Sequence, residues 1–211
     1  MTTCHIDHLT ITAPTLEAGA DYVCRALGVT PQRGGEHPRM GTHNLLLRLG
    51  DSLFLEVIAA NPHAAKPARP RWFGLDALPP DAPPALATWV VRTPDIGASV
   101  SACPEAIGNI EPMSRGALNW QITIPADGTL PLNGIAPALI EWQAQVHPAA
   151  GLQDDGLSLA RLELFHPEPE RITRLLQSLS LEGPVTVSPL RGKHGACMVA
   201  HIHTPQGLRV L

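Results

Sequence analysis

The feature that most constrains the fold of this chain is a pattern of one strand, one helix and further strands that occurs three times. The first copy opens with IDHLTITAPTLEAGADYVCRALG and closes with SLFLEVIAA, within residues 6–60. The second copy occupies residues 86–145 and the third residues 159–211. Internal repetition decides which residues correspond to one another, so it is considered before any single residue.

The repeats place polar residues at two recurring positions. The first position, early in the opening strand, holds His8, Thr88 and Arg161, and the second, in the closing strand, holds Glu56, Glu141 and Arg209. The two positions are 48 residues apart in the first and third copies and 53 apart in the second. The function is expected to depend on how these positions have diverged.

Local signals mark the ends of the helices. Thr15 is a suitable N-cap and Gly28 a suitable C-terminal residue for the first helix. Asp95 can cap the second helix, which Pro104 stops after about two turns. The third helix is predicted at 168–179. Alternating or apolar runs predict strands at 30–33, before a break at Gly34-Gly35, and at 42–49, 53–59, 110–114, 118–124, 136–142, 186–189, 196–204 and 208–211.

Together these elements predict an α+β fold of three βαβββ units. The expected units are residues 1–61, 86–146 and 157–211, and a proline-rich connector at 62–85 carries Trp72 and Phe73 as anchors. One small unit cannot cover both faces of its sheet, so units one and two are expected to pair into a curved sheet around a cleft. The third unit is left for side packing or for a homodimer interface.

Composition excludes several classes of function. The chain has 211 residues and a formal net charge of −4, without a Lys/Arg cluster, so no nucleic-acid partner is expected. No apolar run reaches the roughly 18 residues of a membrane helix, and no signal peptide is recognisable. Four scattered cysteines are then best interpreted as free thiols, which favours a cytoplasmic location.

The segments IDHLTI, GTHNLLLRLGDSLFLEVIA, SRGALNWQITIP, PALIEW and HTPQGLRVL resemble the vicinal oxygen chelate superfamily, which includes glyoxalase I, bleomycin resistance proteins and extradiol dioxygenases. More narrowly, the chain is similar to glyoxalase-like domain proteins. In metal-using members each of two units gives one ligand from its first strand and one from its last. The resemblance therefore implies His8, Glu56 and Glu141 as ligands of Zn²⁺, Ni²⁺, Mn²⁺ or Fe²⁺, with Thr88 where a fourth ligand is usual.

Each candidate has an ordinary structural alternative. His8 shares a strand face with Thr10 and Thr12 but could equally be a hydrogen-bonded core histidine. Glu56 could instead pair with Arg48 or Arg115. For His43 and Asn44, at the start of a strand, the alternative to ligand binding is turn chemistry.

Arg115 and Trp120 would bind a ligand carboxylate and provide an apolar wall, or else be a surface arginine and a core tryptophan. For Arg161 and Arg209, an ion-pair network is favoured over an anion site.

Two functions follow. The first is a metal-dependent isomerase, lyase or dioxygenase acting on a small oxygenated or carboxylated molecule, in which Glu56 and Glu141 could also act as general acid and base. The alternative is a metal-free protein that sequesters a small molecule between Trp72, Trp89, Trp120 and Trp142.

Overall fold

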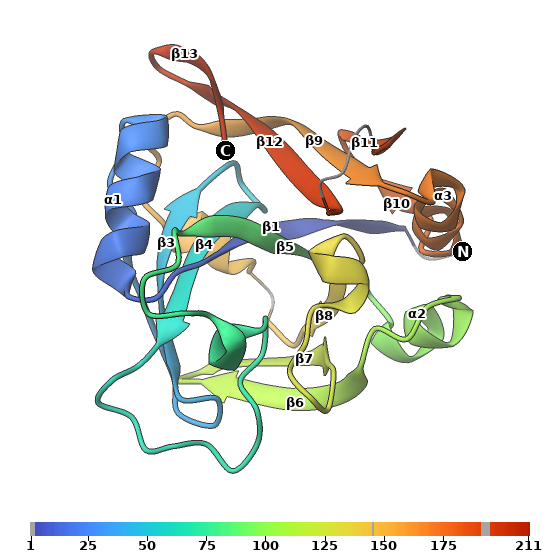
Figure 1. The fold of residues 1–211 in the computed structure, drawn as a ribbon, viewed down its shortest axis with the longest axis horizontal. Coiled ribbons are helices and arrows are strands. Elements are labelled where there is room, and N and C mark those ends of the chain that lie inside the picture. The colour runs from blue at the N-terminus through green and yellow to red at the C-terminus, as the bar shows by residue number, and fades with distance from the viewer. Residues whose placement is uncertain (1–2, 145, 191–194) are drawn as a thin grey trace.

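The structure, a computed structural model, describes residues 3–144, 146–190 and 195–211 (Figure 1). The first unit consists of β1 (Cys4–Thr12), α1 (Leu16–Leu27), β2 (Gln32–His37), β3 (Thr42–Arg48) and β4 (Phe54–Ala60). The second consists of β5 (Ala85–Arg92), α2 (Ile96–Ala102), β6 (Asn109–Arg115), β7 (Leu118–Ile124) and β8 (Ala138–Trp142). Short 3₁₀ turns lie at η1 (Leu75–Ala77), η2 (Pro131–Gly134) and η3 (Pro148–Gly151).

The first two units form one continuous sheet with a local two-fold arrangement. Its strand order is β2-β3-β4-β1-β5-β8-β7-β6, so each unit has the same order read outward from the central antiparallel pair β1–β5. In both units the first strand runs parallel to the last. The outer strands β2 and β6 approach each other, where Nη1 of Arg39 donates to the carbonyl of Pro112 over 2.6 Å. The sheet therefore curls around an interior space.

The third unit contains β9 (Ser158–His166), α3 (Pro169–Ser178), β10 (Leu181–Glu182), β11 (Val185–Pro189), β12 (Cys197–Thr204) and β13 (Gly207–Val210). It repeats the order of elements but not the pairing. The two-residue β10 joins β1, and the remaining strands form a second sheet of order β11-β9-β12-β13. This sheet covers the outer face of β1 and β5, beside α1, as Figure 1 shows.

Two apolar clusters separate the outer and inner layers. The outer cluster joins alternate residues of the central strands, such as Leu9 and Trp89, to Val23 of α1 and to Leu162 and Ile202 of the second sheet. The inner cluster faces the enclosed space and is described with the site. The predicted α+β fold, with a curved sheet of two units and a third unit packed at its side, is confirmed.

Local chemistry explains the helix ends. The Thr15 hydroxyl accepts from the backbone N–H of Ala18 over 3.2 Å, and Gly28 takes a left-handed conformation with φ 77°. The Asp95 carboxylate accepts from the backbone N–H of Ala98 over 2.9 Å at the start of α2. The expected break at Gly34-Gly35 is wrong: β2 continues through both glycines, with a bulge between Arg33 and Gly35.

The connector is pinned as expected, with Trp72 and Phe73 buried in the inner cluster. Among the described residues no helix is long and apolar enough to cross a membrane.

In the third unit, β12 separates Arg161 from Arg209, and Glu163 forms ion pairs with Arg161 and His201 over 3.3 and 2.6 Å. Arg161 is thus part of an ion-pair network, as the sequence favoured, whereas Nη2 of Arg209 donates to Oε1 of Gln206 over 3.4 Å.

Candidate functional site

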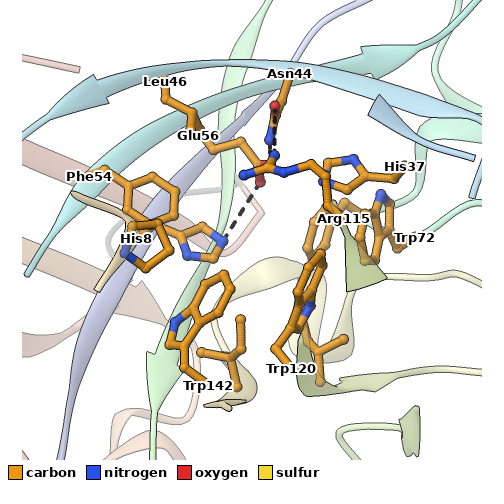
Figure 2. Close-up of a pocket in the computed structure, with 14 residues that line it drawn as sticks. His8, His37, Asn44, Leu46, Phe54, Glu56, Trp72, Arg115, Trp120 and Trp142 are labelled. Atoms are coloured by element: carbon orange, nitrogen blue, oxygen red, sulfur yellow. Dashed lines mark hydrogen bonds and ion pairs between the residues drawn. The ribbon is translucent and has the colours of Figure 1, made fainter. Parts of the chain in front are cut away.

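The space enclosed by the curled sheet is a narrow pocket, in which the centre of a water molecule has about 30 Å³ of room; its empty volume is about 430 Å³ when the open solvent at its mouth is included (Figure 2). Strands of both units line it, together with the connector and η3. Its polar residues are His8, His37, Asn44, Glu56 and Arg115, and its aromatic residues are Phe54, Trp72, Phe73, Trp120 and Trp142. A mainly apolar pocket with a few convergent polar groups is typical of small-molecule sites.

His8 enters the pocket from β1 next to a β-bulge. The pairing of β1 with β5 shifts between Ile6 and His8, so Asp7 is the extra residue. A bulge turns two consecutive side chains toward one face, where regular alternation would send them to opposite faces. Asp7, which is fully buried, therefore lies beside the ring of His8, with Oδ1 2.6 Å from Nδ1.

Glu56 faces His8 from β4, the strand parallel to β1. Its Oε2 is 3.7 Å from Nε2 of His8 and accepts a long hydrogen bond of 3.4 Å from the Thr10 hydroxyl. Its Oε1 accepts from the side-chain amide of Asn44 over 2.6 Å. Both His8 and Glu56 are only 5% exposed. A buried carboxylate with a histidine beside it is suited to proton transfer at the pocket surface.

Arg115 extends from the end of β6 across the pocket toward the same carboxylate (Figure 2). Its Nη1 donates to Oδ1 of Asn44 over 3.3 Å, and the backbone N–H of Gly35 donates to the same oxygen over 2.8 Å. Burial lowers the pKa of the Arg115 guanidinium, and the nearby Glu56 charge opposes this shift. Arg48, the other partner considered for Glu56, instead pairs with Asp51 over 2.6 Å.

Aromatic rings form the walls. Phe54 stacks on the His8 ring with centroids 4.5 Å apart and planes 14° apart, and Trp120 meets Trp142 at 5.2 Å. Trp72 stands edge-on to His37 at 5.0 Å. These flat surfaces favour a planar ligand over a bulky branched one.

His37 contributes a neutral imidazole to the pocket wall. Its Nδ1 lies 3.2 Å from the Thr42 hydroxyl. Burial, assisted by the charges of Arg115, His8 and His43, lowers the pKa of His37 to about 3. At neutral pH it can therefore exchange hydrogen bonds with a ligand but not supply a positive charge.

The structure does not bring Glu141 into the pocket. Its neighbours Ile140 and Trp142 face inward, so Glu141 points outward and its Oε2 accepts from the backbone N–H of Ile96, over 2.7 Å, at the start of α2. A carboxylate there stabilises the helix N-terminus.

His43 is also outside the pocket. It lies on the face of β3 opposite Asn44, where Glu17 of α1 influences its charge. Burial is the main cause of the lowered pKa of His43. Of the predicted residues, His8, Asn44, Glu56, Arg115 and Trp120 come together.

The residues present do not fit the predicted metal centre. In unit one, Glu56 of β4 is opposite Thr10, which lies two residues beyond His8 in β1. In unit two, Ile140 of β8 is opposite Arg92, which lies two residues beyond Val90 in β5. Val90 and Ile140 therefore occupy the positions equivalent to His8 and Glu56. Both ligand positions of the second unit are thus apolar. Within the described part of the chain, no three His, Cys, Asp or Glu side chains are grouped to hold a metal ion. His8 and Glu56 are two donors where a stable site usually has three or four.

Comparison with known proteins agrees with this fold. The family model described as "Glyoxalase-like domain" matches residues 6–180. The chain belongs to this family. This confirms the resemblance recognised from the sequence.

Among solved structures, a hypothetical protein from Staphylococcus aureus is similar with a TM-score of 0.59 and 10% identity, over 92% of this chain and 90% of that one. A methylmalonyl-CoA epimerase of Streptomyces coelicolor, in complex with 2-nitronate-propionyl-CoA, has a TM-score of 0.45 and 16% identity, over 66% of this chain and 97% of that one. No curated protein sequence matches the chain.

The residues at the site that were not predicted include Asp7, His37, Phe54 and His147. Phe54 could have been found, because it shares the strand face of Glu56 two residues away. Asp7 is hidden by the bulge, and His37 and His147 reach the site only through tertiary contacts.

Proposed function

We propose that the pocket binds a small planar molecule bearing a carboxylate, and that His8 and Glu56 transfer protons to and from it without a resident metal ion. This corresponds to isomerase- or lyase-type chemistry. The observation that carries the proposal is the separation of 3.7 Å between Nε2 of His8 and Oε2 of Glu56. A ligand atom can stand within about 3 Å of both, which is the reach needed for proton transfer.

The surrounding groups suit an enolisable acid. The Arg115 guanidinium offers two parallel donors to a carboxylate, and the tryptophan walls suit a flat hydrocarbon part. One member of the His8–Glu56 pair takes the proton from the carbon beside the ligand carbonyl. The C–H electrons form the enolate, and the proton then returns to the other face or to a neighbouring atom, so the step needs no oxidant.

A second candidate is a binding protein without catalysis. The apolar Val90 and Ile140 at the metal positions, and Trp72, Trp120 and Trp142 in the walls, favour it equally. Trp89, the fourth tryptophan of that hypothesis, lies in the outer cluster and donates to the carbonyl of Ile135 over 2.9 Å. The two candidates differ in whether Glu56 affects turnover or only affinity.

Phenylpyruvate is a suitable probe because it combines an aryl ring, a carboxylate and exchangeable C3 protons. Exchange of those protons in D₂O would be followed by ¹H NMR with wild-type protein, Glu56→Gln and the matched control Glu141→Gln. Glu56→Gln is expected to slow the enzyme-dependent exchange about 10²- to 10⁴-fold, as is typical for loss of a general acid or base. Glu141→Gln should leave it unchanged.

Binding of phenylpyruvate without enzyme-dependent exchange would support the binding protein. Exchange that is equally fast in Glu56→Gln would contradict the assigned role of this carboxylate. If calorimetry detects no binding and ¹H NMR no enzyme-dependent exchange, the proposed ligand class is overturned.

A further inference from the structure

Asp7 is a buried carboxylate whose two oxygens accept from three side chains. Oδ1 lies 2.6 Å from Nδ1 of His8, and Oδ2 accepts from Nε1 of Trp142 over 2.8 Å. Oδ2 also lies 2.9 Å from Nε2 of His147, in the segment leading to η3. Asp7 itself has no exposed surface. Fully buried carboxylates are rare unless paired, and this one has three side-chain partners.

The positions of the protons follow from the partners. The indole N–H of Trp142 can only donate. Nδ1 of His147 accepts from the backbone N–H of Ala149 over 3.2 Å, so its proton must be on Nε2, the atom that faces Asp7. Burial raises the pKa of Asp7, but hydrogen bonds from His147 and His8 outweigh burial and hold it well below the ordinary value. An ionised Asp7 has no proton to give, so Nδ1 of His8 must donate.

We propose that Asp7 is the positioning residue of the site, holding His8 with its proton on Nδ1 so that the Nε2 lone pair faces Glu56 and the ligand. The Phe54 ring stacked on His8 fixes the plane of the imidazole. His8 is then the group that accepts a proton from the ligand. The catalytic part of this inference rests on the proposed function, whereas the tautomer does not.

The variant Asp7→Asn tests the inference because an amide cannot accept on both sides. Two donors, Trp142 and His147, face the position of Oδ2, and one donor, His8, faces Oδ1. The amide oxygen is therefore expected to turn toward the two donors and the NH₂ group toward His8. Nδ1 of His8 must then accept, and its proton moves to Nε2.

The ¹⁵N chemical shifts of the His8 ring, measured at pH 8 without any ligand, report the tautomer directly. Wild-type protein should show the Nδ1–H form and Asp7→Asn the Nε2–H form. Trp142→Phe is the matched control: it removes one donor but leaves the carboxylate ionised, so the Nδ1–H form should persist. A purely structural role for Asp7 would not predict this difference between the variants.

An Nε2–H form in the wild type, a ring that stays doubly protonated up to pH 9, or a flip in Trp142→Phe would each overturn the inference. So would an unchanged tautomer in folded Asp7→Asn. If Asp7→Asn does not fold, an Nε2–H form in the wild type or in Trp142→Phe would still overturn the inference, and the Nδ1–H form in both would support it.

In the phenylpyruvate assay, Asp7→Asn should slow exchange about 10²- to 10⁴-fold with unchanged affinity. If the tautomers are as stated but the wild type exchanges no protons, the proposed function fails while the positioning by Asp7 stands.

Discussion

Nε2 of His8 and Oε2 of Glu56 lie 3.7 Å apart, with Asp7 and Asn44 hydrogen-bonded to their far sides. The two groups are too far apart for a direct hydrogen bond and close enough to share one proton through a ligand atom. Asp7 orients His8 and Asn44 orients Glu56, so the two side chains are held in place before a ligand binds.

Arg115 should determine the preference for anionic ligands. Replacing it by lysine keeps the charge but loses the planar fork, and should weaken phenylpyruvate binding by about 1–2 kcal/mol, or roughly tenfold. Arg115→Gln should cost more, and the neutral ethyl ester of the same acid should bind all three proteins alike. Calorimetric titration measures this, with Arg209→Gln, an exposed arginine of the second sheet, as control. Equal losses for acid and ester would contradict a carboxylate contact.

Gly35→Ala should disturb the same contact from the opposite edge of the sheet. A methyl group at Gly35 would stand 2.7 Å from Cδ of Arg115, a flexible side chain that can move away. Arg115 would then leave Asn44, and phenylpyruvate affinity should fall several-fold while the free energy of unfolding changes by less than about 1 kcal/mol. Gly151→Ala, near the pocket but with open space around the added methyl group, is the control and should change neither quantity. A loss of stability without a loss of affinity would argue against this displacement.

Helix ends and most strands were predictable because their signals are local. Thr15, Gly28 and Asp95 each act within one turn of chain. The pairing of the third unit was not predictable, because the parallel partner of β9 is chosen by long-range packing. In unit one the first strand pairs in parallel with the last, whereas β9 pairs in parallel with β11.

The misplacement of Glu141 has a more specific cause. In the parallel pair β5–β8, Val90 is opposite Ala138. A residue of β5 and a residue of β8 therefore point to the same face of the sheet when their residue numbers differ by an even number. The spacing of 53 from Thr88 to Glu141 is odd and puts the two side chains on opposite faces. The odd spacing alone could therefore have shown that Thr88 and Glu141 do not face the same pocket. The bulge at Asp7 had no comparable signal, because alternation in β1 otherwise looks regular.

Chelation should not affect this protein, because among the described residues no three His, Cys, Asp or Glu side chains are grouped to hold a metal ion. Protein purified without chelators is expected to hold well below one equivalent of Zn, Ni, Mn or Fe by elemental analysis, and EDTA should leave the Tm and the exchange rate unchanged. His8→Ala provides the comparison. One equivalent of metal in the wild type, lost in His8→Ala, would show that a further donor completes the site and would restore the metal-dependent mechanism.

His37 should make the folded protein sensitive to mild acid. Its pKa falls from the ordinary 6.5 to about 3 on folding, since burial and the charges of Arg115, His8 and His43 all disfavour protonation. Between these values the unfolded chain binds a proton that the folded chain does not. Stability is therefore fully present above pH 6.5 and is lost as the pH falls toward 3, by up to roughly 1.4 kcal/mol per pH unit.

His37→Phe removes this titration while keeping an aromatic ring between Trp72 and Trp120. Urea unfolding at a series of pH values from 4 to 7 should show a slope that is shallower by close to one proton. The absolute stability of the variant can differ, because the Thr42 hydroxyl loses its partner, so the slope is the decisive quantity. His203→Gln, which changes an exposed histidine of β12, is the control for loss of a histidine outside the pocket. An unchanged slope in His37→Phe would mean that His37 is protonated in the folded protein, and the pocket would then carry a second positive charge beside Arg115.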